Sequence, residues 1–180
     1  MCSFYSGSSD HGQLGHGSLD DLDTLAKVEG LIGHFIVQVA AGDDHTIALT
    51  SEGAVFTFGS NEDGRTGHGT TEGNQTTPRK VGGCLDGRKV VSVAAGALHT
   101  ACIDEDGDIY TWGKGEYGRL GHGDETDRSS PKVVRGLIGK KCSAVACGAY
   151  HTLVIAENGK VFSFGHGKRG QLGHGDLKTN

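Results

Sequence analysis

The sequence of 180 residues predicts an all-β fold, as part of a β-propeller built from four-stranded antiparallel blades. The first observation is a repeat, because a glycine hexapeptide begins at residues 12, 64, 118 and 170, as GQLGHG, GRTGHG, GRLGHG and GQLGHG. Two other phrases keep the same step, namely AAGDDHT, AAGALHT and ACGAYHT, and VFTFG, IYTWG and VFSFG. The second observation is composition: 32 glycines stand among short apolar clusters, which is typical of short strands joined by tight turns. A repeat of about 50 residues with four short strands indicates a propeller blade.

One unit shows how each strand is predicted. VVSVAAG (90–96) is an apolar strand ending in small residues, as the innermost strand of a tapering blade requires, and HTACID (99–104) is the next strand. DIYTWG (108–113) follows a hairpin in which Gly107 needs positive φ, and its bulky aromatic residues are expected to fill the space between blades. PKVVRG (131–136) is the fourth strand, because a proline suits the edge of a sheet.

The chain is predicted to be a single run of such repeats, with units at approximately 1–17 (partial), 18–69, 70–123 and 124–175. An open arc of three to four blades would expose apolar blade faces and strand edges. We therefore expect the chain to be a fragment of a larger propeller whose remaining blades lie on the same chain. Closure by a second copy, as a homodimer, is the alternative.

Composition excludes several classes of function. The net charge is −5 and no run of lysines or arginines occurs, so direct binding of nucleic acid is not expected. No signal peptide and no apolar stretch of membrane-spanning length is present, so we expect an intracellular protein of the cytoplasm, the nucleus or both. Five cysteines, an odd number without a C-x-x-C pair, predict free thiols rather than disulfides or a zinc knuckle.

The glycine hexapeptides are predicted to be structural turns rather than phosphate-binding loops. Neither a Walker motif nor a G-x-G-x-x-G sequence followed by a helix occurs, so no cofactor is expected. Each turn is expected to use positive φ at its glycines. The twelve turn glycines are Gly12, Gly15, Gly17, Gly64, Gly67, Gly69, Gly118, Gly121, Gly123, Gly170, Gly173 and Gly175.

The histidines are likewise predicted to be structural, with no metal site. One histidine stands in each hexapeptide, so successive blades should hold these rings apart. His45, His99 and His151 each precede a threonine, and their rings are expected to bond backbone groups near the start of a strand. No nucleophile has a base at a suggestive spacing, so catalysis within this segment is not expected, while a catalytic domain elsewhere in a longer chain stays open.

The order of AAGxxHT, a hairpin glycine, YTWG and GRLGHG resembles the regulator of chromosome condensation repeat, which builds seven-bladed propellers. The resemblance implies an interaction module. Some members of that family are guanine-nucleotide exchange factors for the Ran GTPase, some are domains of HECT-type ubiquitin ligases, and one plant group senses UV-B light. The exchange factor uses an inserted β-wedge, for which the even spacing here leaves no room. The light sensors use a tryptophan-rich GWRHT phrase, whereas Trp112 is the single tryptophan of this chain.

Two sets of loop residues vary between the repeats while the framework stays constant. One set precedes each HT phrase, and the other lies between the aromatic strand and the hexapeptide. Varied loops on one face of a repeat protein are often where partners bind. The candidate partner-binding residues are Asp43, Asp44, Leu98, Tyr117, Tyr150, Lys168 and Arg169.

The sequence thus predicts a scaffold for protein–protein interaction, with protein partners among which a small GTPase is one candidate. Two alternatives stay open: an exchange factor for a Ran-type GTPase, and a regulatory or substrate-binding segment of a HECT-type ubiquitin ligase.

Overall fold

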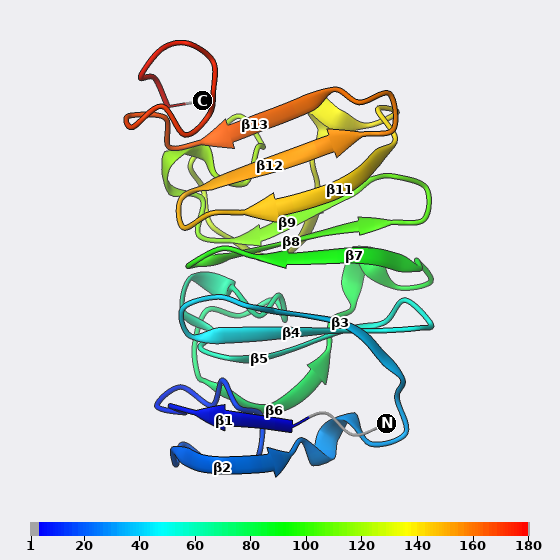
Figure 1. Ribbon diagram of the computed structural model, residues 1–180, viewed down its shortest axis with the longest axis vertical. Coiled ribbons are helices and arrows are strands. Elements are labelled where there is room, and N and C mark those ends of the chain that lie inside the picture. The colour runs from blue at the N-terminus through cyan, green and yellow to red at the C-terminus, as the bar shows by residue number, and fades with distance from the viewer. Residues whose placement is uncertain (1–3, 180) are drawn as a thin grey trace.

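The computed structural model describes residues 4–179, which form four antiparallel sheets that follow one another along the chain (Figure 1). The prediction of an all-β fold with four-stranded antiparallel sheets is confirmed. Short 3-10 turns connect the strands: η1 (Glu29–Leu31), η2 (Glu62–Gly64), η3 (Gly83–Leu85), η4 (Glu116–Gly118) and η5 (Arg135–Leu137). The strands are β1 (Phe4–Gly7) and β2 (Leu22–Lys27); β3 (Ile36–Ala41), β4 (His45–Thr50), β5 (Val55–Gly59) and β6 (Gln75–Lys80); β7 (Val90–Ala95), β8 (His99–Asp104), β9 (Ile109–Gly113) and β10 (Arg128–Val133); and β11 (Cys142–Cys147), β12 (His151–Ala156) and β13 (Val161–Gly165).

The three sheets that begin with β3, β7 and β11 are meanders in which the first strand lies innermost. The hydrogen-bonded orders are β1-β2, β3-β4-β5-β6, β7-β8-β9-β10 and β11-β12-β13. Strand β7 lies against both β3 and β11, so the first strands of successive sheets gather on one side of the arc (Figure 1). These are the strands rich in alanine, and their small side chains allow this close approach.

The sheets are offset from the sequence units that end at the hexapeptides. The outer strand of each complete sheet follows the hexapeptide, and it therefore lies in the next unit along the sequence. It nevertheless pairs back onto the strand before the hexapeptide, with Arg128 opposite Gly113 and Val133 opposite Tyr110. The reason is that the glycine turn and the polar loop after it reverse the chain, so that antiparallel pairing closes the sheet.

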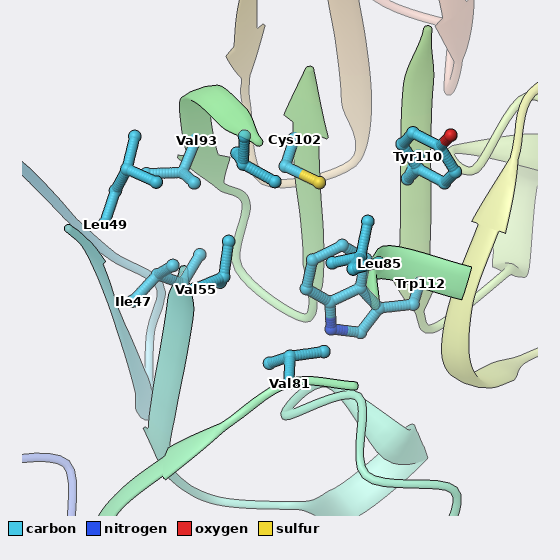
Figure 2. Packing of buried hydrophobic residues seen from close by; sticks show 10 residues of the cluster. Ile47, Leu49, Val55, Val81, Leu85, Val93, Cys102, Tyr110 and Trp112 are labelled. Carbon is cyan, nitrogen blue, oxygen red and sulfur yellow. The ribbon is translucent and has the colours of Figure 1, made fainter. Parts of the chain in front are cut away.

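The core lies between neighbouring sheets rather than within one. Figure 2 shows the largest cluster, in which side chains of the sheet β3–β6 face those of the sheet β7–β10. Trp112 is fully buried in this interface, as predicted for the aromatic residues of the third strand. The labelled members are Ile47, Leu49, Val55, Val81, Leu85, Val93, Cys102, Tyr110 and Trp112.

All twelve hexapeptide glycines have positive φ, which is the conformation predicted for them. The middle glycine of the hexapeptide has a second role, shown at Gly67. A Cβ atom there would lie 2.7 Å from Nε1 of Trp112, and the equivalent atom at Gly121 would lie 2.8 Å from the Phe164 ring. Glycine therefore reverses the chain and also leaves room for the aromatic side chain of the following sheet.

The buried histidines bond side chains of the next sheet, so the expectation of backbone partners for their rings was wrong for His45 and His99. Nε2 of His45 lies 3.0 Å from Oγ1 of Thr100, and Nε2 of His99 lies 2.9 Å from Oγ1 of Thr152. The sequence places each threonine next to a histidine of its own unit. Its bonding partner is the histidine of the preceding unit, which only the stacking of sheets brings near.

Each of these threonine hydroxyls also donates its proton to a backbone carbonyl. Thr100 donates to the carbonyl of Arg65, and Thr152 donates to that of Arg119, both at 2.9 Å. Because the hydroxyl has one proton, the histidine must be the donor, which places the ring proton on Nε2. The ring is neutral, since burial lowers the pKa of His45 to about 3, with the Arg65 charge acting in the same direction.

Three further findings concern the residues 4–179. No helix among them is long and apolar enough to cross a bilayer. Within the same range, no three histidine, cysteine, aspartate or glutamate side chains are grouped as a metal site would require. The four cysteines in it, Cys84, Cys102, Cys142 and Cys147, are free thiols, and Cys2 lies outside the described residues.

Candidate functional site

The two sets of variable loops lie side by side on one face of the protein. The amide of Ser60 donates to the carbonyl of Asp44 at 2.7 Å, and the amide of Lys114 donates to that of Leu98 at 2.9 Å. In the last sheet, His166 donates in the same way to Tyr150 at 2.9 Å. Each of these three sheets therefore brings one loop of either set to the same edge.

Two arginines that the sequence reasoning did not single out lie beneath this face. Arg65 and Arg119 hold the second position of their hexapeptides, where the first and last copies have Gln13 and Gln171. The Arg65 side chain is 2% exposed, and that of Arg119 is fully buried. Nε of each donates to the carbonyl three residues earlier, at 2.9 and 2.8 Å, which fixes the guanidinium below the loops.

Carboxylates surround the first arginine. The guanidinium of Arg65 lies 3.7 Å from Asp44, 3.6 Å from Glu62 and 3.4 Å from Asp63. Nζ of Lys114 lies 3.1 Å from Asp63 and links this cluster to the next sheet. The candidate residue Asp44 thus neutralises a buried cation, while the side chain of Asp43 is exposed.

Aromatic rings surround the second arginine. Cζ of Arg119 lies 5.6 Å from the centre of the Tyr117 ring and 5.1 Å from that of Tyr150, within the range of cation–π contact. Glu116 is the one carboxylate in salt-bridge contact with it among the described residues, at 3.3 Å. Burial lowers the pKa of Arg119, although the guanidinium stays charged at neutral pH.

Three rings meet above Arg119. The Tyr117 ring centre lies 4.7 Å from that of His166 and 6.1 Å from that of Tyr150, both pairs meeting edge to face. The third pair, Tyr150 and His166, is separated by 6.2 Å. Nε2 of Gln171 donates to Nδ1 of His166 at 2.8 Å and so fixes the orientation of the imidazole.

These side chains line a groove of about 810 Å³, termed here the aromatic groove. It brings together four of the seven candidate residues, Leu98, Tyr117, Tyr150 and Arg169. Lys168 is exposed beside Arg169 but does not line the groove, and Asp43 and Asp44 lie at the edge of the sheet β3–β6. The lining consists of Leu98, Glu116, Tyr117, Ala149, Tyr150, His151, His166, Arg169 and Gln171.

Tyr117 holds its position at a conformational cost. Its φ is +64°, in the left-handed region, and Asp63 at the equivalent position has φ +57°. Aspartate tolerates this region, whereas for a bulky residue it is uncommon and costs about 1–2 kcal/mol. Strained residues of this kind gather at functional sites. Tyr117 was singled out from the sequence for its aromatic side chain in a variable loop. Its backbone conformation is a second, independent reason for that choice.

The fold and this loop face define part of a β-propeller of repeated blades, with a groove at one edge. Comparison with known proteins agrees with that class: the model of the RCC1-like domain matches residues 2–180. The chain belongs to this family.

Two curated relatives show the likeness in sequence. The chain is 46% identical over 174 residues to the ultraviolet-B receptor UVR8 of Arabidopsis thaliana, covering 97% of this chain and 39% of the relative. It is 43% identical over 168 residues to the human E3 ubiquitin-protein ligase HERC2, covering 91% of this chain and 3% of the relative. The chain therefore spans well under half of the length of these relatives.

Solved structures show the same fold. Human WBSCR16 superposes with a TM-score of 0.88 at 26% identity, over 99% of this chain and 46% of that chain. Prp20p of Saccharomyces cerevisiae, whose structure was described together with its binding to Gsp1p and histones, gives a TM-score of 0.83 at 27% identity. That match covers 97% of this chain and 43% of Prp20p.

Proposed function

We propose that this chain is a protein-binding module and that the aromatic groove contacts its partner. The observation that carries the proposal is the groove itself, in which tyrosines, a histidine and an arginine from two sheets converge around a buried guanidinium. Tyrosine and arginine are enriched among the residues that dominate the energy of protein interfaces. The strained backbone of Tyr117 supports the same interpretation, because a merely structural position would be cheaper with aspartate or glycine.

The proposal is one of binding without catalysis. Two titratable side chains in the groove, Glu116 and His166, are already engaged by neighbouring groups. Glu116 pairs with Arg119, and Nδ1 of His166 accepts a hydrogen bond from Gln171. Such groups orient the surface of the groove.

Capture of partners from cell extract by the immobilised chain tests this role. Tyr150→Ala removes a side chain that is 46% exposed in the groove, and Phe35→Ala removes one that is 53% exposed before β3, at the other end of the strands. We expect partners to be retained by the Phe35 variant and lost by the Tyr150 variant. For a purified partner, the loss should be about 30-fold in Kd or more, the effect of a side chain that contributes about 2 kcal/mol. Equal capture by both variants would contradict the proposal.

A small GTPase is the second candidate for the partner, with nucleotide exchange as the activity. The likeness to Prp20p supports it, since that protein's structure was described with its binding to Gsp1p. Release of labelled GDP from a Ran-type GTPase measures the activity directly. A release rate unchanged by a large excess of the chain would rule out exchange and leave binding to be tested separately.

The third candidate is the regulatory or substrate-binding part of a ubiquitin ligase, supported by the 43% identity to HERC2. In that case the groove would select the protein that is modified, and catalysis would lie on another domain. Ubiquitin transfer by a longer chain, compared with and without Tyr150→Ala, distinguishes this role, because the variant should lose transfer to the substrate alone.

A further inference from the structure

A hollow of about 340 Å³, termed here the basic hollow, lies between the outer strands β6 and β10 of the two complete sheets. The rest of its lining comes from the second hexapeptide and from the segment that follows β6. It shares no residue with the aromatic groove, so it is a separate feature of the surface. The lining consists of Gly67, His68, Arg79, Lys80, Gly82, Gly83 and Ser130.

The basic hollow carries positive charge that no acidic side chain neutralises. Arg79 and Lys80 are exposed, and within residues 4–179 neither side chain forms an ion pair or a hydrogen bond. No aspartate or glutamate is among the lining residues. Asp86 lies in the next turn, where it accepts the amide of Gly83 at 2.8 Å, and it does not line the hollow. In a chain of net charge −5, this pair of cations is therefore free to attract an anion from solution.

Strand pairing explains why Arg79 faces the hollow. It lies opposite Thr57 of β5, and residues directly opposite in an antiparallel pair have their side chains on the same face. The Thr57 hydroxyl donates to the carbonyl of Thr66 at 2.6 Å and accepts from Nε2 of His68 at 3.0 Å, which fixes the imidazole at this face. Burial, and after it the charge of Arg79, lower the pKa of His68 to about 4, so the ring is neutral at pH 7. The positive charge of the hollow at pH 7 is thus that of Arg79 and Lys80.

The segment after β6 differs from its two counterparts in a way that exposes backbone. It reads VGGCLDG (81–87), whereas the others read VEGLIG (28–33) and VRGLIG (134–139), so it has one more residue. Gly82 stands where the other copies have glutamate and arginine, and it brings no side chain into the hollow. A Cβ atom at Gly83 would meet no atom within 4 Å, so the backbone there borders open space. Glycines at such positions let a ligand approach the main chain closely.

The pair of adjacent cations is particular to this sheet. The two positions hold arginine and lysine in β6, alanine and lysine in β2, and lysine and valine in β10. The outer strand therefore forms without a second cation, and the framework of the repeat does not account for the pair Arg79 and Lys80.

We propose that the basic hollow binds a phosphoryl group, either as inorganic phosphate or on a phosphorylated side chain. A guanidinium can bind two phosphate oxygens at once, and the adjacent ammonium supplies a second charge, which suits a group that carries about two negative charges at pH 7. A carboxylate would leave one of the two cations unpaired. The hydroxyl of Ser130 has no partner within the described residues and can donate a further hydrogen bond to a phosphate oxygen. This site does not depend on the role of the aromatic groove.

Titration of the isotope-labelled intact chain with inorganic phosphate, at constant ionic strength and pH 7, tests the proposal by NMR. The amides of Gly67, Gly82 and Gly83 belong to two separate segments of the sequence that meet in the hollow. Their chemical shifts should change together along one saturating curve, with a Kd of about 10 mM or less. Gly73 lies in an exposed loop, where a Cβ atom would meet nothing within 4 Å, and its shift should stay nearly constant.

Two arginine variants separate binding in the hollow from general attraction of anions. Arg79→Gln removes a lining cation and should weaken phosphate binding at least about fivefold. Arg135→Gln removes the same charge from an exposed side chain outside the hollow, and should change Kd by about twofold or less. Because both side chains are exposed, both variants should keep the unfolding midpoint of the parent chain.

A parallel titration with phosphoserine in a capped tripeptide distinguishes the two sources of the phosphoryl group. Tighter binding of the phosphopeptide than of phosphate identifies a phosphorylated side chain as the ligand, and the reverse order identifies free phosphate. Either order, with the loss confined to Arg79→Gln, supports the proposal. Absence of saturation at about 50 mM of both ligands, equal loss in the two arginine variants, or acetate binding as tightly as phosphate would each overturn it.

Discussion

Replacing Thr152 by valine should destabilise the protein about twice as much as replacing Thr100 by valine, although the two threonines occupy equivalent positions. Both side chains are fully buried, and each hydroxyl accepts from a histidine and donates to an arginine carbonyl. Valine keeps the shape of the side chain and removes both bonds. The two sites differ in what remains to satisfy the carbonyl.

At the Thr100 site, a second donor is present. Nε1 of Trp112 also donates to the Arg65 carbonyl, at 3.0 Å, so Thr100→Val leaves one buried group without a partner, the imidazole N–H of His45. At the Thr152 site, the residue equivalent to Trp112 is Phe164, which has no donor. Each unsatisfied buried group costs about 1–3 kcal/mol, which gives about 2 kcal/mol for Thr100→Val and about 4 kcal/mol for Thr152→Val.

Urea unfolding monitored by circular dichroism measures the difference. With a slope of about 2 kcal/mol per molar urea, the midpoints should fall by about 1 M and about 2 M. Thr71→Val, at an exposed position, serves as the control and should stay within about 0.5 kcal/mol of the parent chain. In a Trp112→Phe background, Thr100→Val should become as costly as Thr152→Val. Equal effects of the two valine substitutions in the parent chain would refute the argument that a second donor to the Arg65 carbonyl makes Thr100→Val the less costly change.

Acidification should destabilise the fold between about pH 6.5 and 3, because burial lowers the pKa of both His45 and His99 from 6.5 to about 3. The unfolded chain binds these protons at a higher pH than the folded chain does, so the free energy of unfolding that is present above pH 6.5 falls by about 2–3 kcal/mol between pH 6 and 5. A urea midpoint that is the same at pH 5 as at pH 6 would contradict this. Gly67→Ala should cost at least about 2 kcal/mol more than Gly73→Ala, as thermal unfolding would show. Both glycines have positive φ, but only at Gly67 would the new Cβ collide, with Trp112, whereas nothing lies within 4 Å at Gly73. Similar losses at the two glycines would show that φ alone sets the cost.

The sequence was sufficient for the first three strands of a sheet because the repeat displays each of them three times. The fourth strand, expected at 131–136, lies three residues earlier as β10 (Arg128–Val133), because the chain turns into η5 at Arg135. VVSVAAG (90–96) became β7 and DIYTWG (108–113) became β9, with ends that differ by one residue. Local signals decide such elements, since a hairpin glycine and an alternation of apolar residues act within a few positions. The loop candidates Tyr117 and Tyr150 could be found in the same way, as departures from a constant framework.

The partners across sheets could not be predicted from one unit. His45 was expected to bond nearby backbone, but its partner Thr100 lies 55 residues away and becomes a neighbour only when the sheets stack. Arg65 and Arg119 were missed because an arginine in a glycine-rich turn is usually exposed, and the groups that enclose it come from other loops. The signal available was the change from glutamine to arginine at one hexapeptide position, in the two inner copies alone.

The bonds between histidine and threonine join only adjacent sheets, and this has a consequence for how the protein opens. The sheet β7–β10 carries both His99, which reaches forward to Thr152, and Thr100, which receives His45. Each of the sheets β3–β6 and β11–β13 takes part in only one of these two bonds. In a linear array with nearest-neighbour coupling, the member held on both sides opens last. To open, the sheet β7–β10 must therefore break both of these bonds, whereas each of its two neighbours breaks only one of them.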